Sequence, residues 1–271
     1  NYRVQDMKKF FVIFVLLMSF DTFSAPSNAA KALESWVYYA LLRIDEKESQ
    51  KRYAEVEEDY RELIYQSGWS TRSFDHAIIL KKYGFFLIQR DRAEEGLEFI
   101  DWALRKRALE DRDAHNLEYV VGQINASLGN YEKALEMLLG WYDLGQRRNY
   151  DISPKGIALI GICYAQLEDF RLALDYISIA IDQSNIFIRS WNELKFALHY
   201  KLGEMDNALE TSKDLVAFHP REKKYLEQMG AMYSENDFDL ESLSSLEFGL
   251  TQDILEKERD YLILSNFFMF K

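Results

Sequence analysis

Cysteine, proline and glycine are all scarce in this sequence of 271 residues, and each shortage excludes a class of structure. A single cysteine, Cys163, leaves no partner for an intrachain disulfide. Three prolines and 12 glycines are too few for a β-sandwich or β-barrel, which needs frequent turns. With 29% charged and 48% hydrophobic residues, the composition favours long helices joined by short links around a sizeable core.

Positive charge is also in short supply. Lysine and arginine number 33 against 45 acidic residues, which gives a formal net charge of −12 at pH 7. This acidity opposes binding to phosphate backbones and to anionic lipid, so we expect no nucleic-acid partner. The same acidity is ordinary for soluble proteins, and solubility alone explains it.

Residues with catalytic or metal chemistry do not gather in the sequence. The four histidines are mutually remote and lack partners at the spacing that helical metal sites use: His76, His115, His199 and His219. No glycine-rich phosphate loop is present. We therefore expect no enzyme, no metal and no cofactor.

Three further features have structural interpretations. Cys163 lies in an apolar helical run, which predicts a buried and inert thiol. The acidic residues between positions 55 and 59 predict a solvated helix face. Residues 237–239 predict a turn, because the alternating ligands of a calcium loop are missing.

The N-terminal region has the pattern of a secretory signal. The stretch Met7-Lys8-Lys9 precedes an apolar run over residues 10–20, which is too short to span a bilayer comfortably. Small residues favour cleavage after Ala29 over cleavage after Ala25. We expect residues 1–29 to be upstream sequence and a signal peptide, and the mature protein to be periplasmic without a membrane span; retention as an inner-membrane anchor is the alternative.

The most informative pattern is an internal repeat. A small residue is followed by a turn, an aromatic residue and Ala-Leu in residues 122–135 and again in residues 161–174. Residues 196–209 repeat the pattern with Phe196 at the small position. The marker positions from Gly84 to Gly230 are separated by 38, 39, 35 and 34 residues, which indicates one repeated supersecondary unit.

This pattern resembles the tetratricopeptide repeat, a unit of about 34 residues that forms two antiparallel helices. The resemblance implies an all-α, right-handed superhelical solenoid of antiparallel helix pairs over residues 30–271, with about six repeats and a terminal half repeat. The two helices of a pair can approach only where side chains are small. One such set is Gly84, Gly122, Gly161 and Gly230, and the other is Gly96, Ala134, Ala173, Ala208 and Ser242.

Other positions complete the expected unit. The aromatic residue after the turn, Tyr53, Tyr131 or Phe170, should fill the space between units, and Pro220 should close one unit. An earlier, degenerate unit has helices near residues 31–48 and 53–66, with Val56 at its packing position. Extra residues should lie in loops such as 145–153. Residues 256–271 read as a first helix without its partner, so we expect the natural chain to continue; an apolar interface is the alternative.

Function in such a solenoid usually resides on the surface lined by the first helix of each pair. Its candidate protein-binding residues are Lys81, Phe85, Tyr119, Gln123, Lys155, Gln166, Glu193, Tyr200 and Lys201, with Ile78, Ile88, Asn116, Ser127, Ala158, Ile162 and Ala197 beside them. Their mixture of aromatic, amide and charged groups is suited to an extended or helical peptide. Packing between helices is an equal explanation for Phe85, Ile88 and Ile162. Clamping of a terminal carboxylate is disfavoured, because Phe85, Ala158 and Ile162 replace the amide and basic groups that it needs.

A narrower resemblance covers the chain from about residue 40 onward. The passages 83–87, 130–135, 189–191 and 216–225 are similar to those of periplasmic tetratricopeptide proteins associated with the TonB system. That resemblance implies a non-catalytic accessory of TonB, ExbB and ExbD in iron-complex uptake. The alternatives are a scaffold or regulator of a cell-wall enzyme, or the repeat part of a longer multidomain protein. The sequence leaves the partner and the oligomeric state open.

Overall fold

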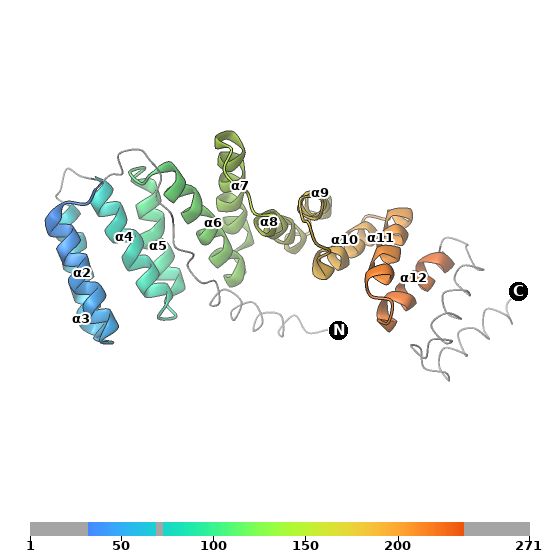
Figure 1. Ribbon diagram of the computed structural model, residues 1–271, viewed down its shortest axis with the longest axis horizontal. Coiled ribbons are helices and arrows are strands. Elements are labelled where there is room, and N and C mark those ends of the chain that lie inside the picture. Colours follow the sequence, from blue (N-terminus) through green and yellow to red (C-terminus); the bar gives the residue numbers. More distant parts are fainter. Residues whose placement is uncertain (1–31, 69–72, 236–271) are drawn as a thin grey trace, which may run out of the picture. The chain divides into compact units, whose positions relative to one another are not determined.

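The computed structural model describes residues 32–68 and 73–235, and within these ranges it contains helices and no strand (Figure 1). The eleven helices of these ranges are α2 (Ser35–Ser49), α3 (Tyr53–Gly68), α4 (Ser73–Ile88), α5 (Ala93–Arg105), α6 (Asp111–Leu128), α7 (Tyr131–Arg148), α8 (Pro154–Gln166), α9 (Phe170–Asp182), α10 (Arg189–Lys201), α11 (Met205–Phe218) and α12 (Lys223–Glu235). The prediction of an all-α fold is confirmed.

Consecutive helices form antiparallel pairs joined by short turns: α2 with α3, α4 with α5, α6 with α7, α8 with α9, and α10 with α11. We call the first helix of each pair an A helix and the second a B helix, and α12 follows as a further A helix. The chain divides into two compact units, Asn1–Gly145 and Gln146–Lys271. No helix within residues 32–68 and 73–235 has the length and apolar composition that a membrane span requires.

The small residues predicted from the repeat lie where the helices of a pair approach each other. A Cβ atom added at Gly84 would lie 2.6 Å from the carbonyl oxygen of Gly96 on the partner helix. One added at Gly122 would lie 2.5 Å from the side chain of Leu138, with the carbonyl oxygen of Ala134 close by. In the second unit the same atom at Gly161 would lie 3.0 Å from the carbonyl oxygen of Ala173. The repeat register is therefore confirmed in three successive pairs.

The turns between A and B helices share one backbone conformation. Each of the five contains a residue with positive φ: Lys51, Asp91, Gly129, Glu168 and Gly203. The following residue donates its N–H to a carbonyl in the last turn of the A helix, for example from Asn130 to Asn125 at 2.9 Å. This pattern closes the A helix and satisfies its free carbonyls. The turn needs no glycine, since three of its five central residues carry side chains.

The core of the first unit is built mainly from aromatic and aliphatic side chains of α2, α3 and α4. Val56 is fully buried, as predicted, and Tyr60 and Tyr83 pack with their ring centroids 5.3 Å apart. A second cluster joins α4 and α5 to α6 through Leu80, Ile100 and other buried residues. Tyr53, predicted to fill the space between repeats, is 40% exposed, so it covers this space only in part. Its ring contacts Arg90 of the next helix pair, whose guanidinium carbon lies 3.8 Å from the ring centre.

The structure corrects the predicted loop over residues 145–153. Helix α7 continues to Arg148, so the residues in excess of the usual repeat lie largely in the long helices α6 and α7. The basic residues Arg147 and Arg148 stand in the last turn of α7, where they favour the helix end electrostatically.

The interpretation of the acidic stretch near residue 57 as a solvated face is only partly right. Glu55 and Glu58 are exposed, but Glu57 and Asp59 are half-buried and bind neighbouring helices. Asp59 accepts a hydrogen bond from Lys47 of α2 at 2.6 Å. Helical periodicity alone did not reveal the arginine that Glu57 meets on the next pair.

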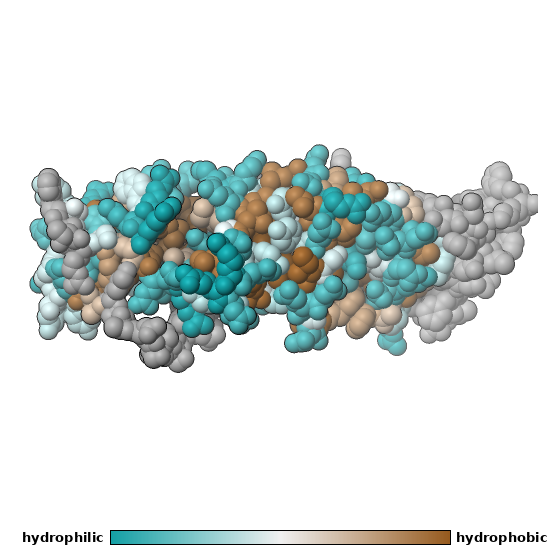
Figure 2. All heavy atoms as spheres, turned by 90° about the horizontal axis from the view of Figure 1, so that it is seen from above, coloured by the Kyte–Doolittle hydropathy of each residue, from teal (hydrophilic) through white to brown (hydrophobic). Residues whose placement is uncertain are grey.

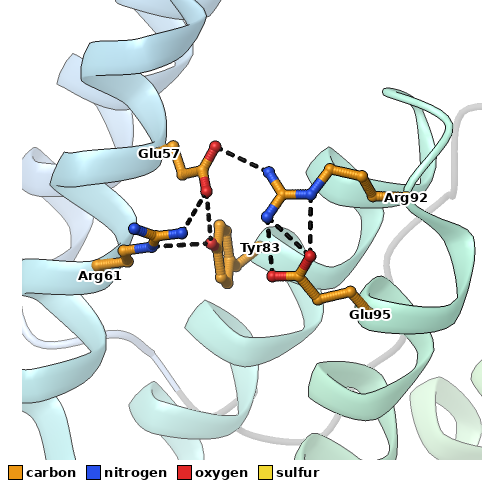
Figure 3. A network of polar contacts seen from close by, with 5 residues as sticks. All are labelled: Glu57, Arg61, Tyr83, Arg92 and Glu95. Atoms are coloured by element: carbon orange, nitrogen blue, oxygen red, sulfur yellow. Dashed lines mark hydrogen bonds and ion pairs between the residues drawn. The ribbon is translucent and has the colours of Figure 1, made fainter.

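The carboxylate of Glu57 lies at the centre of a polar network (Figure 3). Arg92, at the start of α5, donates to it at 2.9 Å, and Arg61 donates from the same helix as Glu57. Arg92 also binds Glu95 at 2.9 Å, and Arg61 contacts the Tyr83 hydroxyl on α4. The network therefore ties α3 of one pair to α4 and α5 of the next.

Several predictions lie outside the described residues. They are the signal segment within residues 1–29, the small residue Ser242, the turn at 237–239 and the final helix over 256–271.

Candidate functional site

The solvent-facing stripe of α4 contains the first predicted site residues. Ile78, Lys81 and Phe85 follow one another at helical spacing and are half-buried, while the opposite side of α4 is buried. Phe85 and Ile88 pack against the cluster that joins α4, α5 and α6. Both side chains therefore contribute to helix packing as well as to the surface.

On α6, the half-buried stripe contains Asn116, Tyr119, Gln123 and Ser127. The Tyr119 ring stacks on Trp141 of α7, with the ring centroids 4.8 Å apart. Burial raises the pKa of the Tyr119 hydroxyl, so this group stays protonated at neutral pH. Tyr119 is thus anchored to its B helix, and Gln123 retains its amide at the half-exposed surface.

Helix α2 adds two residues that the sequence did not indicate. Tyr38 and Leu42 are 50% and 45% exposed and lie on the same stripe as Asp45. The Asp45 carboxylate accepts a hydrogen bond from Lys82 of α4 at 3.1 Å, which places this stripe of α2 beside α4. The available signal was the apolar pair at positions i and i+4, which flanks the buried stripe of Val37 and Leu41.

We use the name A-face for the solvent-facing stripes of α2, α4 and α6 in the first unit. It combines exposed or half-exposed hydrophobic groups (Tyr38, Leu42, Ile78, Phe85), amides (Asn116, Gln123) and the cation Lys81. Each of these side chains is carried by an A helix, so the repeat itself brings them into one series.

In the second unit, α8 and α10 carry the remaining predicted residues. Lys155, Gln166, Tyr200 and Lys201 are exposed. Ala158 is only 1% exposed, so it belongs to the core and does not line a surface, because α8 is apolar on nearly all sides. Ile162 is half-buried and Ala197 is exposed. Figure 2 shows hydrophobic groups at the surface among hydrophilic ones in the part that contains α8 and α9.

Glu193 is held by the next A helix instead of being free for a ligand. Its carboxylate accepts hydrogen bonds from the Tyr225 hydroxyl at 2.5 Å and from Lys224 at 3.0 Å. Burial alone would raise the pKa of Glu193, but these bonds outweigh it and lower that pKa. Burial and the nearby carboxylate raise the pKa of Tyr225 to about 12. Glu193 therefore links α10 to α12.

The cysteine and histidine side chains that could serve in catalysis or metal binding are buried or bound to neighbouring residues. Burial raises the pKa of the Cys163 thiol to about 12, which keeps it protonated, and the predicted buried thiol is confirmed. His199 lies 2.7 Å from Glu204, which also binds Arg171 of α9. Within the described part of the chain, no group of three or more histidine, cysteine, aspartate or glutamate residues could hold a metal ion.

Neither a protein-family model nor a curated protein matches this sequence. Solved structures do match. YrrB, described as a TPR protein with an unusual peptide-binding site, is 19% identical with a TM-score of 0.53, over 76% of this chain and 97% of YrrB. A tetratricopeptide repeat protein from Parabacteroides merdae is 14% identical with a TM-score of 0.51, over 80% of each chain.

A third match is MamA AMB-1, which is 14% identical with a TM-score of 0.51, over 69% of this chain and 97% of MamA. At these identities the likeness establishes the fold alone. The chain therefore has the tetratricopeptide-type fold of stacked helix pairs, as the repeat register indicated.

Proposed function

We propose that this chain is a non-catalytic scaffold that binds a protein or peptide on its A helices. The observation that carries the proposal is the A-face, where hydrophobic, amide and cationic groups lie together on consecutive A helices of a tetratricopeptide-type fold. Such a mixture suits peptide recognition, since apolar contacts provide affinity and polar groups fix the register. The peptide-binding site named for YrrB supports a peptide as the class of ligand.

A comparison of matched variants tests this proposal. Leu42→Asp places a charge on the exposed part of the A-face, and Tyr65→Asp does the same on α3, where the tyrosine is 69% exposed. Both variants should fold, because Leu42 and Tyr65 are 45% and 69% exposed and neither belongs to the buried core. Partners that co-purify with the full chain should be lost with Leu42→Asp and retained with Tyr65→Asp. Equal recovery with both variants would contradict binding at this face.

The cellular setting is a further part of the proposal. We propose export to the periplasm and association with the TonB–ExbB–ExbD system, on the basis of the N-terminal segment and the passages that resemble TonB-associated repeat proteins. Fractionation of cells that produce the full chain tests export. Cross-linking followed by affinity purification tests the partner: TonB-system components are expected, and recovery of a cell-wall enzyme would favour the alternative scaffold role.

A further inference from the structure

Lys81 differs from the neighbouring lysine on the same helix. Lys82 donates to both carboxylate oxygens of Asp45, at 3.1 and 3.2 Å. Lys81 has no carboxylate partner in residues 32–68 and 73–235, although its side chain is half-buried. On α4, the A-face therefore presents a cation, Lys81, that no carboxylate of the described residues neutralises.

The surroundings of Lys81 are apolar and amide-bearing. Phe85 follows one turn later on α4, and Ile78 precedes it on the same stripe. On the side of α2 the face continues with the exposed Tyr38 and Leu42, and on α6 it continues with the half-exposed Gln123. A cation among apolar groups is partly shielded from water. An opposite charge that binds it therefore gains more electrostatic free energy than it would at an open surface.

We propose, resting on the peptide-binding function above, that the A-face of the first unit recognises a peptide in which an acidic side chain adjoins apolar ones. Lys81 receives the carboxylate, and Leu42, Tyr38 and Phe85 receive the apolar neighbours. Charge complementarity at Lys81 carries this choice, and this local attraction acts against the repulsion expected from the chain's net charge of −12. Lys82 cannot take the same role while Asp45 holds it.

Selection from a random peptide library tests the proposal without a known ligand. A library of twelve-residue peptides displayed on phage is selected against the full chain, against Lys81→Gln and against Lys133→Gln. Lys133 is an exposed lysine on α7, a B helix, so its substitution removes the same charge from another surface. Peptides with aspartate or glutamate beside leucine or phenylalanine should be enriched by the parent and by Lys133→Gln, and not by Lys81→Gln.

Fluorescence anisotropy with the most enriched peptide then measures the charge preference. Replacing its acidic residue by the corresponding amide should weaken binding to the parent about tenfold and leave binding to Lys81→Gln unchanged, as expected for loss of one charge-assisted contact. Selected peptides without acidic residues, or an equal loss in both proteins, would overturn the role of Lys81 and leave peptide binding intact. Failure to select any peptide would overturn the inference, while the co-purification of partners would still decide the proposed function.

Discussion

At the scale of single residues, this fold depends on positions where a side chain is absent. A Cβ atom at Gly84 would lie 2.6 Å from a backbone oxygen and 2.5 Å from Ile100, and the backbone atom cannot turn aside as a side chain can. Gly84→Ala should therefore lower the free energy of unfolding by about 1–3 kcal/mol. Urea denaturation monitored by circular dichroism measures the change.

The control for this substitution lies on α7. Gly140 is exposed within the helix, and the nearest atom to an added Cβ is 3.9 Å away on Glu118. Gly140→Ala should stabilise the protein by about 0.5–1 kcal/mol, since alanine favours a helix interior over glycine. If both substitutions changed stability in the same direction, the close-packing explanation would be wrong.

Glu118 provides a prediction that depends on pH. One of its carboxylate oxygens is buried without a hydrogen-bond partner, and burial raises the pKa of this group in the folded state. The folded state then holds its proton to higher pH than the unfolded state does, so stability falls as pH rises through the interval between the two pKa values. Glu118→Gln should raise the free energy of unfolding at pH 7 and have little effect at pH 4. A uniform effect at both values would contradict this assignment.

The residues of the core were more predictable than those of the surface. Gly84, Gly122 and Gly161 could be placed from spacing, because close helix crossings admit only small side chains and recur with the repeat. Tyr38 and Leu42 could not, since the first helix pair (α2 with α3) lacks the small-residue marker and exposure depends on neighbours that spacing does not specify. The prediction that Ala158 lines the surface was wrong, because residues on nearly all sides of its helix are buried.

At the scale of elements, polar contacts join one helix pair to the next. Hydrogen bonding from Arg92 is the main cause that lowers the pKa of Glu57, and burial acts against it. Because the folded pKa is depressed, the stabilisation is present at neutral pH and is lost as pH falls through the folded value. Glu57→Gln should cost about 0.5–1 kcal/mol at neutral pH.

The pH dependence distinguishes this contact from simple loss of packing. The effect of Glu57→Gln should shrink in acid, where the parent carboxylate is itself protonated. Glu58→Gln, on the exposed side of the same helix, should change stability little at any pH. Thermal unfolding of both variants between pH 3 and pH 7 would decide; a Glu58 effect as large as that of Glu57 would refute the role of the network.

Among the elements, the sequence predicted the positions of the turns better than the ends of the helices. The positions of the A–B turns followed from the repeat, because each turn uses the same backbone conformation. The end of α7 at Arg148 did not follow, since Gly145 suggested a loop but lies within the helix. A glycine in an otherwise helical segment is tolerated when neighbouring contacts compensate its lower helix propensity.

At the scale of the whole molecule, the stability of a repeat protein is approximately the sum of the stabilities of its single repeats and of the contacts between neighbouring repeats. Ala173 is fully buried against Gly161, so Ala173→Leu should overpack this crossing and cost about 1–3 kcal/mol. Hydrogen–deuterium exchange should accelerate in α8 and α9 and remain unchanged in α2 and α3. Equal acceleration in all helices would show that the chain unfolds as one cooperative body.

Site-specific photocross-linking in living cells tests the central claim most directly. A photoreactive amino acid is placed at Leu42 or Gln123 on the A-face, or at Lys133 or Tyr65 on B helices, in the full chain. All four positions are exposed or half-exposed, so each reports on partners without disturbing the core. We predict that the two A-face positions form adducts with one defined protein or peptide. The two B-helix positions should form none. Adducts of equal yield from all four positions, or from the B helices alone, would contradict a scaffold that binds its partner through the A-face.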